Sequence, residues 1–292
     1  MSDPAELLKK VRKIEIKTRG LSSQIFSGEY HSAFKGKGMA FSEVREYIPG
    51  DDIRSIDWNV TARLNHPYVK IFEEERELTV ILLVDISGSG SFGSTSQMKK
   101  DLVTELCAVI AFSAIQNNDK IGVILFSDKI EKFIPPKKGK SHILRIIREL
   151  INFQPTSNGT DIGSALKYFS NMIKRRAIVF VISDFIDEGF EDPLKIAARK
   201  HDLVALQAYD ERETELPNIG LIRIKDAETG EMRIVDTSSK SARRAQHNWW
   251  IEKQNKLYEF FAKSGIDHVG LKTGQDYVKP LMGLFKKRER RA

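Results

Sequence analysis

The sequence has one cysteine, no apolar stretch of membrane-spanning length and no secretory leader, and each absence excludes a class of protein. Cys107 has no second cysteine to pair with, so the fold cannot depend on internal disulfides as small secreted proteins do. No uninterrupted apolar run approaches the ~20 residues that a bilayer-crossing helix needs. The first residues lack the basic start and apolar core of a secretory signal. We therefore expect a cytoplasmic protein.

The usual constellations of catalysis are also missing. No glycine-rich loop leads into Lys-Ser or Lys-Thr, so the chain should not bind ATP through a P-loop. No histidine, lysine or cysteine accompanies the polar motifs described below as a base. The histidines are scattered over His31, His66, His142, His201, His247 and His268. We predict that the protein is not an enzyme, while a metal-dependent hydrolase remains the alternative.

Charge of one sign is only slightly in excess. There are 47 Lys and Arg residues against 40 Asp and Glu residues, which gives a net charge of +7. This balance is typical of a solvated globular surface. A basic tail closes the chain at Lys286, Lys287, Arg288, Arg290 and Arg291. That tail leaves open a third reading, in which the protein binds nucleic acid or an anionic membrane surface.

Strand and helix patterns alternate through the middle of the chain. Apolar runs of strand length cover residues 79–84, 121–126, 177–182 and 202–207, and a short strand over 129–134 should end at Pro135 and Pro136. Apolar residues at helical spacing cover 97–117 and 143–150. This order predicts an α/β fold with a doubly wound, mostly parallel sheet of the Rossmann type.

Three regions follow from these patterns. Residues 1–76 should hold a helix with Leu7, Val11 and Ile14 on one face, followed by a small accessory region. Residues 77–215 should form the main domain. Residues 216–292 should complete it or pack on it, with a hairpin over 220–236, a helix over 242–262, a strand at 268–271 and a last helix carrying Tyr277, Leu281 and Phe285.

The chemistry-bearing stretch follows the first apolar strand. Asp85, Ser87 and Ser89 alternate along the loop, and alternate residues of an extended chain point the same way. One carboxylate and two hydroxyls can therefore converge, and such hard oxygen donors suit Mg²⁺. Thr160 precedes another helix and Asp184 ends another apolar strand. Ligands of open α/β sheets bind beyond the carboxyl ends of the strands.

These five residues resemble the metal-ion-dependent adhesion site of the von Willebrand factor A fold, whose first motif is Asp-x-Ser-x-Ser. The resemblance implies that Asp85, Ser87, Ser89, Thr160 and Asp184 hold Mg²⁺ or another hard divalent cation. It also implies an open position that a carboxylate of a partner protein fills. Asp161, next to Thr160, is either an outer member of this site or a helix cap.

A dense upstream block sharpens the resemblance. It includes Gly36, Gly38, Phe41, Arg45-Glu46-Tyr47, Pro49-Gly50-Asp51-Asp52, Arg54, Ile56-Asp57-Trp58 and Ala62-Arg63. This block is similar to the signature of a bacterial family called domain of unknown function 58, which joins it to a von Willebrand factor A-like domain. Its members are commonly encoded beside MoxR-type AAA+ ATPases. We read the block itself as a packed segment with paired charges, ordered by Asp57 and Trp58.

The function that the resemblance implies is a metal-dependent protein-interaction module. Its partners would be a MoxR-type AAA+ ATPase and a client protein that supplies the carboxylate.

Overall fold

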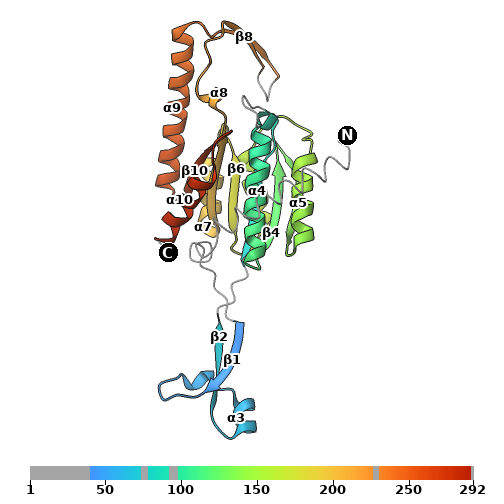
Figure 1. The fold of residues 1–292 in the computed structure, drawn as a ribbon, viewed down its shortest axis with the longest axis vertical. Coiled ribbons are helices and arrows are strands. Elements are labelled where there is room, and N and C mark those ends of the chain that lie inside the picture. Colours follow the sequence, from blue (N-terminus) through green and yellow to red (C-terminus); the bar gives the residue numbers. More distant parts are fainter. Residues whose placement is uncertain (1–39, 74–77, 92–97, 226–229, 291–292) are drawn as a thin grey trace. The chain divides into compact units, whose positions relative to one another are not determined.

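The computed structural model describes residues 40–73, 78–91, 98–225 and 230–290. The chain divides into two compact units, one of residues 35–78 and one that includes residues 79–292 (Figure 1). The predicted helix around Leu7, Val11 and Ile14 lies outside the described residues, as do Gly36 and Gly38 of the upstream block.

A six-stranded sheet forms the centre of the larger unit. Its strand order is β10-β7-β6-β3-β4-β5, and every neighbouring pair is parallel except β4 and β5. The strands are β3 (Thr79–Asp85), β4 (Lys120–Phe126), β5 (Ile130–Lys137), β6 (Ile178–Ser183), β7 (Asp202–Tyr209) and β10 (Asp267–Lys272). The inner strands are buried on both faces, which is why they read as continuous apolar runs. The predicted doubly wound sheet is confirmed.

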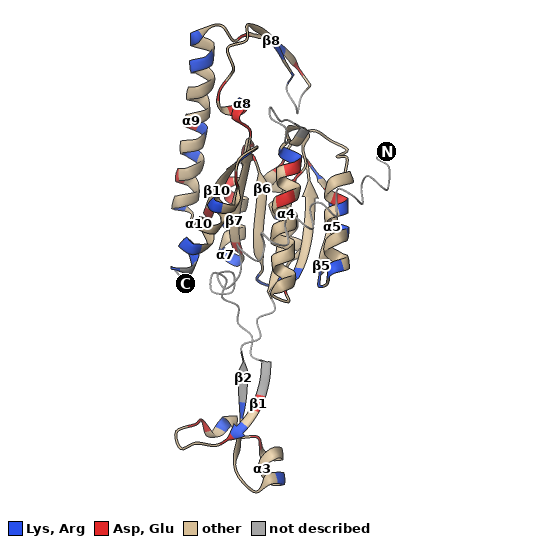
Figure 2. Cartoon of the chain, viewed as in Figure 1, with Lys and Arg blue, Asp and Glu red and all other residues tan. Residues whose placement is uncertain are grey.

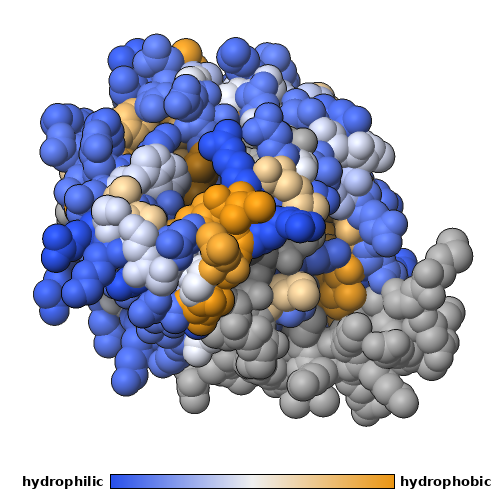
Figure 3. Space-filling view, turned by 90° about the horizontal axis from the view of Figure 1, so that it is seen from above, coloured by the Kyte–Doolittle hydropathy of each residue, from blue (hydrophilic) through white to orange (hydrophobic). Residues whose placement is uncertain are grey.

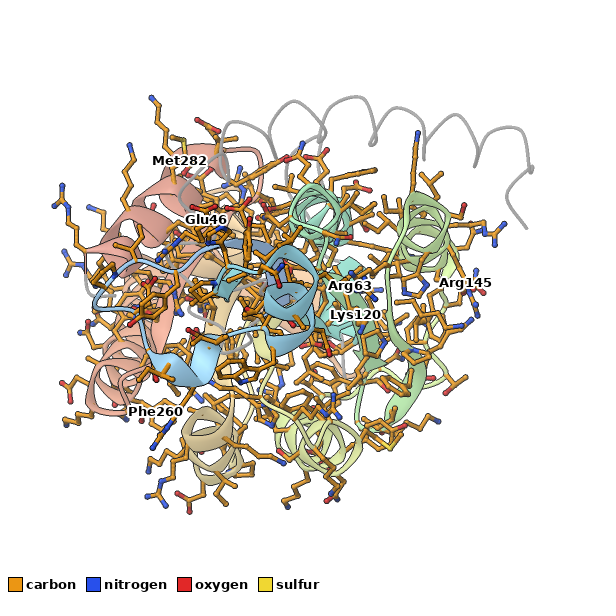
Figure 4. The ribbon with its side chains drawn as sticks, turned by 90° about the horizontal axis from the view of Figure 1, so that it is seen from below. Glu46, Arg63, Lys120, Arg145, Phe260 and Met282 are labelled. Carbon is orange, nitrogen blue, oxygen red and sulfur yellow. The ribbon has the colours of Figure 1, made fainter. Side chains whose placement is uncertain are left out.

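Helices cover both faces of this sheet (Figures 1 and 4). One face carries α4 (Lys99–Gln116), α5 (Lys140–Asn152) and α10 (Val278–Glu289), and the other carries α6 (Ile162–Met172), α7 (Glu191–Lys200) and α9 (Lys240–Lys263). In Figure 4 the two layers are marked by Met282 of α10 and Phe260 of α9, which lie on opposite sides. Phe169, Leu194 and Phe261 join the α6–α7–α9 layer to the sheet in one buried cluster.

The connections place a switch of direction at the centre of the sheet. From β3 the chain crosses to β4 on one side, and it later returns to β6 on the other side of β3. The carboxyl ends of β3 and β6 are therefore neighbours, with the following loops diverging to opposite sides. Open α/β sheets bind their ligands at this kind of position.

The edge strand β5 corrects the prediction that Pro135 and Pro136 end it. The strand continues through both prolines to Lys137, because its pairing with β4 shifts register there. Gly122 of β4 lies opposite the shift, and a Cβ on it would stand 2.9 Å from both the Ile134 oxygen and the Pro136 nitrogen. Prolines are tolerated here because an outermost strand need not donate every ladder hydrogen bond.

The C-terminal region adds a strand to the sheet and a projecting segment of a short helix and a hairpin, residues 211–236, which we call the arm. β10 joins the sheet beside β7, and α9 and α10 pack against β10. Between β7 and α9, the short helix α8 (Glu211–Thr214) leads into a hairpin of β8 (Leu221–Lys225) and β9 (Met232–Asp236). The hairpin was predicted, and its turn residues 226–229 lie outside the described part. No helix in the described residues is long and apolar enough to cross a membrane.

The smaller unit is a two-stranded sheet with two short helical turns. It contains β1 (Ala40–Glu46), a 3-10 turn (Ile53–Ser55), α3 (Trp58–Leu64) and β2 (Tyr68–Glu73), with β1 antiparallel to β2. Gly50 has φ +114°, a positive value that a type II turn with Pro49 and Gly50 at its centre requires.

Charged side chains pair in the described part of this unit, as predicted. Arg45 donates two hydrogen bonds to Asp51, at 2.7 and 2.8 Å, and Lys70 Nζ lies 3.4 Å from Asp57. Asp57 also caps α3 by accepting from the backbone N–H groups of its first turn, so its ordering role is confirmed. Trp58 is 67% exposed, however, and our reading of it as a packed residue was wrong.

Candidate metal centre

The loop after β3 turns sharply beside the end of the strand. Asp85 Oδ1 accepts a hydrogen bond from the Ser87 N–H at 2.9 Å, which fixes the carboxylate against its own loop. The Oγ atoms of Ser87 and Ser89 lie 3.2 Å apart, so the two hydroxyls converge as predicted. The prediction of an extended loop was wrong, however, because Gly88–Ser91 form a 3-10 turn that includes Ser89. Ser87 is buried, and Asp85 and Ser89 are half-buried.

The end of β6 is tied directly to this loop. The Ser183 hydroxyl donates to Asp85 Oδ2 at 2.6 Å, and Asp184 follows Ser183 in the chain. Asp184 Oδ1 accepts from the Ile186 N–H at 3.1 Å. Since β3 and β6 are parallel neighbours, Asp85 and Asp184 lie at the same carboxyl edge of the sheet.

Phe185, the residue after Asp184, has a strained backbone. Its φ is +56°, a left-handed conformation that is a genuine outlier for a bulky side chain. Its N–H donates to Ser183 Oγ at 3.1 Å, and its ring packs on Phe190 and Phe261. Such strain costs of order 1–3 kcal/mol and persists only where the surroundings impose it. The turn that presents Asp184 is therefore held by packing rather than by local preference.

Thr160 approaches the same edge from the start of α6. The Gly88 N–H donates to the Asn158 oxygen at 2.9 Å, so the loop before Thr160 lies against the Asp85 loop. Asp161 accepts from the Ser164 N–H and Oγ, both at 2.7 Å, and is the helix cap. Of the two roles open for Asp161, the structure shows the cap.

The electrostatics of the edge favour a bound cation. Burial, with the nearby charge of Asp184, raises the pKa of Asp85 from 3.8 to about 6. A divalent cation between the two carboxylates would offset both effects. In the described residues no group of three or more His, Cys, Asp or Glu side chains could hold a metal ion, so a cation at this edge would also need the hydroxyl oxygens as ligands. Two carboxylates with hydroxyls fit a hard cation that keeps some of its water, as Mg²⁺ does.

Three residues of this edge were not predicted, and one of them, Lys99, overturns the prediction that no lysine accompanies the polar motifs. The Lys99 ammonium donates to Asp184 Oδ2 at 2.9 Å and to Glu213 Oε1 at 2.6 Å. Ser183 carries the bond to Asp85 described above. Ser183 could have been found from the same strand-end position that pointed to Asp184. Lys99 and Glu213 gave no sequence signal, since 114 positions separate them.

A separate cavity lies away from these residues. It has a volume of about 680 Å³ and is lined by residues such as His201, Asp202, Lys263 and Arg288. It therefore lies at the amino edge of β7 and β10, where α7 and α9 end. Cations in the last turn of a helix have a structural explanation, because they complement its dipole. The carboxyl edge is the better candidate for a functional site.

The chain resembles a known sequence family, and its fold resembles that of one solved structure at a TM-score of 0.50. The sequence model of a family described as "Protein of unknown function DUF58" matches residues 43–256. An uncharacterised protein of Mycobacterium tuberculosis is 30% identical over 234 residues, which are 79% of this chain and 74% of that one. The structure of an aerotolerance-related membrane protein from Bacteroides fragilis has a TM-score of 0.50 and 16% identity, over 74% of this chain and 100% of that one. The SpRpn10 VWA domain has a TM-score of 0.40 and 12% identity, over 72% and 94%.

Proposed function

Because this chain belongs to the family of proteins of unknown function DUF58 and carries a von Willebrand factor A-like sheet, we propose that it is a metal-dependent protein-interaction module. The observation that carries the proposal is the pairing of Asp85 with the end of β6. Through the Ser183 hydroxyl at 2.6 Å, the structure brings the two strand-end carboxylates of Asp85 and Asp184 to one edge. The charge of Asp184 raises the pKa of Asp85, and a divalent cation between the two carboxylates would offset that repulsion.

The proposed ligands are Asp85, Ser87, Ser89, Thr160 and Asp184. A hard divalent cation bound there supplies a Lewis-acidic point that attracts a further oxygen ligand. The chain's own residues do the rest. Asp85 and the two serine hydroxyls are held on one short loop, and the strained turn at Phe185 fixes Asp184 beside them. An Asp or Glu of a partner would complete the shell and make the contact metal-dependent.

Exposed apolar side chains at the same end of the molecule support a protein partner. The hairpin of β8 and β9 extends beyond the carboxyl edge, and Figure 3, which looks down from that side, shows a hydrophobic patch framed by hydrophilic surface. The exposed apolar residues of the hairpin region are Ile219, Leu221, Ile224, Met232 and Ile234. Contiguous apolar surface rimmed by polar residues is typical of an interaction site. The proposed partner is a MoxR-type AAA+ ATPase, on the strength of the family resemblance.

A hydrolytic role has less support. Among the described residues no hydrogen bond joins a histidine or Cys107 to Asp85, Ser87, Ser89 or Asp184. Cys107 is buried inside α4, and burial raises the pKa of its thiol far above the ordinary range. A nucleophile activated by a neighbouring base is therefore not formed by these groups.

The test is a pull-down followed by a titration. Proteins that co-purify with the chain in Mg²⁺ and are lost in EDTA are identified, and their affinity is measured for wild type and for Asp85→Ala. We expect the variant to fold normally, because Asp85 ends its strand, and to lose most of its affinity. The matched control is Asp192→Ala, an exposed aspartate on α7. Equal affinity of all three proteins with Mg²⁺ and with EDTA would refute the proposal, and turnover of a phosphate or ester substrate that Asp85→Ala abolishes would favour a hydrolase.

A further inference from the structure

Lys99 occupies a position that three physical preferences oppose. It is the first residue of α4, where the positive end of the helix dipole disfavours a cation. Its side chain is only 3% exposed, and lysine is almost never fully buried unless it is paired. Fixing so long a side chain also costs rotamer entropy. Local rules broken together at one residue point to a functional or strained position.

The two carboxylates around Lys99 come from different parts of the fold. Asp184 follows β6 at the metal centre, and Glu213 belongs to α8, which follows β7. Burial lowers the pKa of Lys99, but the charges of Asp184 and Glu213 outweigh it and raise that pKa, so the ammonium stays charged. Figure 2 shows the acidic α8 and the basic first turn of α4 at the same edge of the sheet. One buried cation thus joins the metal centre to α8.

Glu213, a residue of the arm, is in turn tied to residues on both sides of the hairpin. Its Oε2 accepts from the Asp210 N–H at 2.8 Å, and its backbone oxygen accepts from Gln246 Nε2 of α9 at 3.0 Å. Residues 215–220 then lead from α8 into β8, and Arg243 of α9 donates a hydrogen bond to the Thr237 oxygen beyond β9. Hydrogen bonds to α9 therefore hold the chain on both sides of the hairpin, at Glu213 before it and at Thr237 after it.

We propose that Lys99 is an internal cation of the metal centre and couples binding of a divalent cation to the α8–hairpin arm. The inference rests on the proposed metal site and adds its regulation. A divalent cation at Asp85 and Asp184 repels the Lys99 ammonium and weakens its hold on Asp184. The ammonium then binds Glu213 more tightly and holds α8 more firmly. Coupling between two sites is reciprocal, so a partner that grips the arm changes the affinity for the metal by the same factor.

The charges predict opposite effects for two substitutions. Lys99→Met removes the positive charge that lies 2.9 Å from Asp184, one of the proposed ligands, and should tighten Mg²⁺ binding roughly tenfold to a hundredfold. Glu213→Gln removes a negative charge that is separated from Asp184 by the Lys99 ammonium. This substitution should weaken Mg²⁺ binding by about threefold to tenfold. The double variant Lys99→Met with Glu213→Gln removes one charge of each sign and should return close to the wild-type affinity. Lys99→Arg keeps the charge and should stay closest to wild type.

The experiment measures Mg²⁺ binding by isothermal titration calorimetry and backbone hydrogen exchange at residues 211–215. Addition of Mg²⁺ should slow exchange there in wild type, and should leave it unchanged in Glu213→Gln at the same metal occupancy. A purely structural lysine would give no such pattern of signs. If Lys99→Met fails to fold by circular dichroism, Glu213→Gln and the double variant still decide the question.

The outcomes separate the two proposals. Equal Mg²⁺ affinity in wild type and all variants would overturn the coupling while leaving the metal centre intact, and so would Mg²⁺ binding without any change in exchange at 211–215. Absence of Mg²⁺ binding to wild type would remove the metal centre itself and this inference with it.

Discussion

Substituting Asp85 by Asn should stabilise the metal-free protein. The folded state holds the pKa of Asp85 at about 6, against 3.8 for the free group. Between these values the folded state binds more protons than the unfolded state, so the free energy of unfolding falls as pH rises through the window. Above pH 6 the ionised carboxylate costs about 3 kcal/mol, at ~1.4 kcal/mol per pKa unit.

Asn has the same shape and carries no charge. It can accept only one of the two hydrogen bonds that Asp85 receives from the Ser87 N–H and the Ser183 hydroxyl, which forfeits about 1 kcal/mol. The net expected gain at pH 7.5 is about 2 kcal/mol, or roughly 4–8 °C in melting temperature for a unit of this size. Mg²⁺ at ten times its Kd should add about 1.4 kcal/mol to the wild type and nothing to the variant.

The assay is urea unfolding, followed by circular dichroism, at pH 7.5 with EDTA and with Mg²⁺. Asp192→Asn, the same change on an exposed turn of α7, is the control for net charge and should shift stability by less than ~0.5 kcal/mol. A metal-free Asp85→Asn protein that is less stable than wild type would show that the carboxylate stabilises the fold. An equal gain from Mg²⁺ in both proteins would show that Asp85 is not a ligand.

Three further changes test other parts of the structure. Burial, with the charges of Lys200 and Arg176, lowers the pKa of His201 from 6.5 to about 4. The free energy of unfolding should therefore fall by about 3 kcal/mol as pH drops through this window, because the unfolded state binds the proton more tightly. His201→Gln should remove this dependence on pH. The same pH titration on both proteins checks it, and parallel curves would contradict it. Trp58→Ala should change stability by less than ~0.5 kcal/mol because the ring is exposed, and a loss above 2 kcal/mol in urea unfolding would show that it is packed. Gly122→Ala should cost about 1–3 kcal/mol in the same assay, whereas Gly283→Ala on α10, where a Cβ meets nothing within 4 Å, should be neutral or stabilising.

The sequence predicted what depends on local pattern and on sheet topology. The serine hydroxyls of Asp85-x-Ser87-x-Ser89 lie side by side as predicted, although a 3-10 turn at Gly88–Ser91 and not an extended loop brings them together. A second apolar strand ending in Asp184 must end at the same edge if the two strands are parallel. The metal role of these residues stays a prediction. The helix at Asp161 and the turn at Gly50 follow from local capping and φ preferences.

What depends on distant contacts escaped prediction. A lysine at the start of a helix ordinarily indicates a solvated end, and only the fold shows that Lys99 is enclosed by Asp184 and Glu213. Trp58 stands among charged and apolar residues that suggested packing, yet helix α3 leaves its ring exposed. The continuation of β5 through Pro135 and Pro136 depends on Gly122 of the neighbouring strand, where a Cβ would come too close to β5. The sequence of β5 itself contains no sign of this contact.

The two prolines of β5 have a consequence for how copies of this protein meet one another. An outermost strand with a full row of free N–H groups is a template onto which another chain can add, and proteins that expose one tend to aggregate. Pro135 and Pro136 provide no N–H groups near the end of that row, and the pairing with β4 shifts register beside them. At the opposite edge, α9 and α10 pack against β10. The sheet can therefore stay six strands wide in a crowded cell.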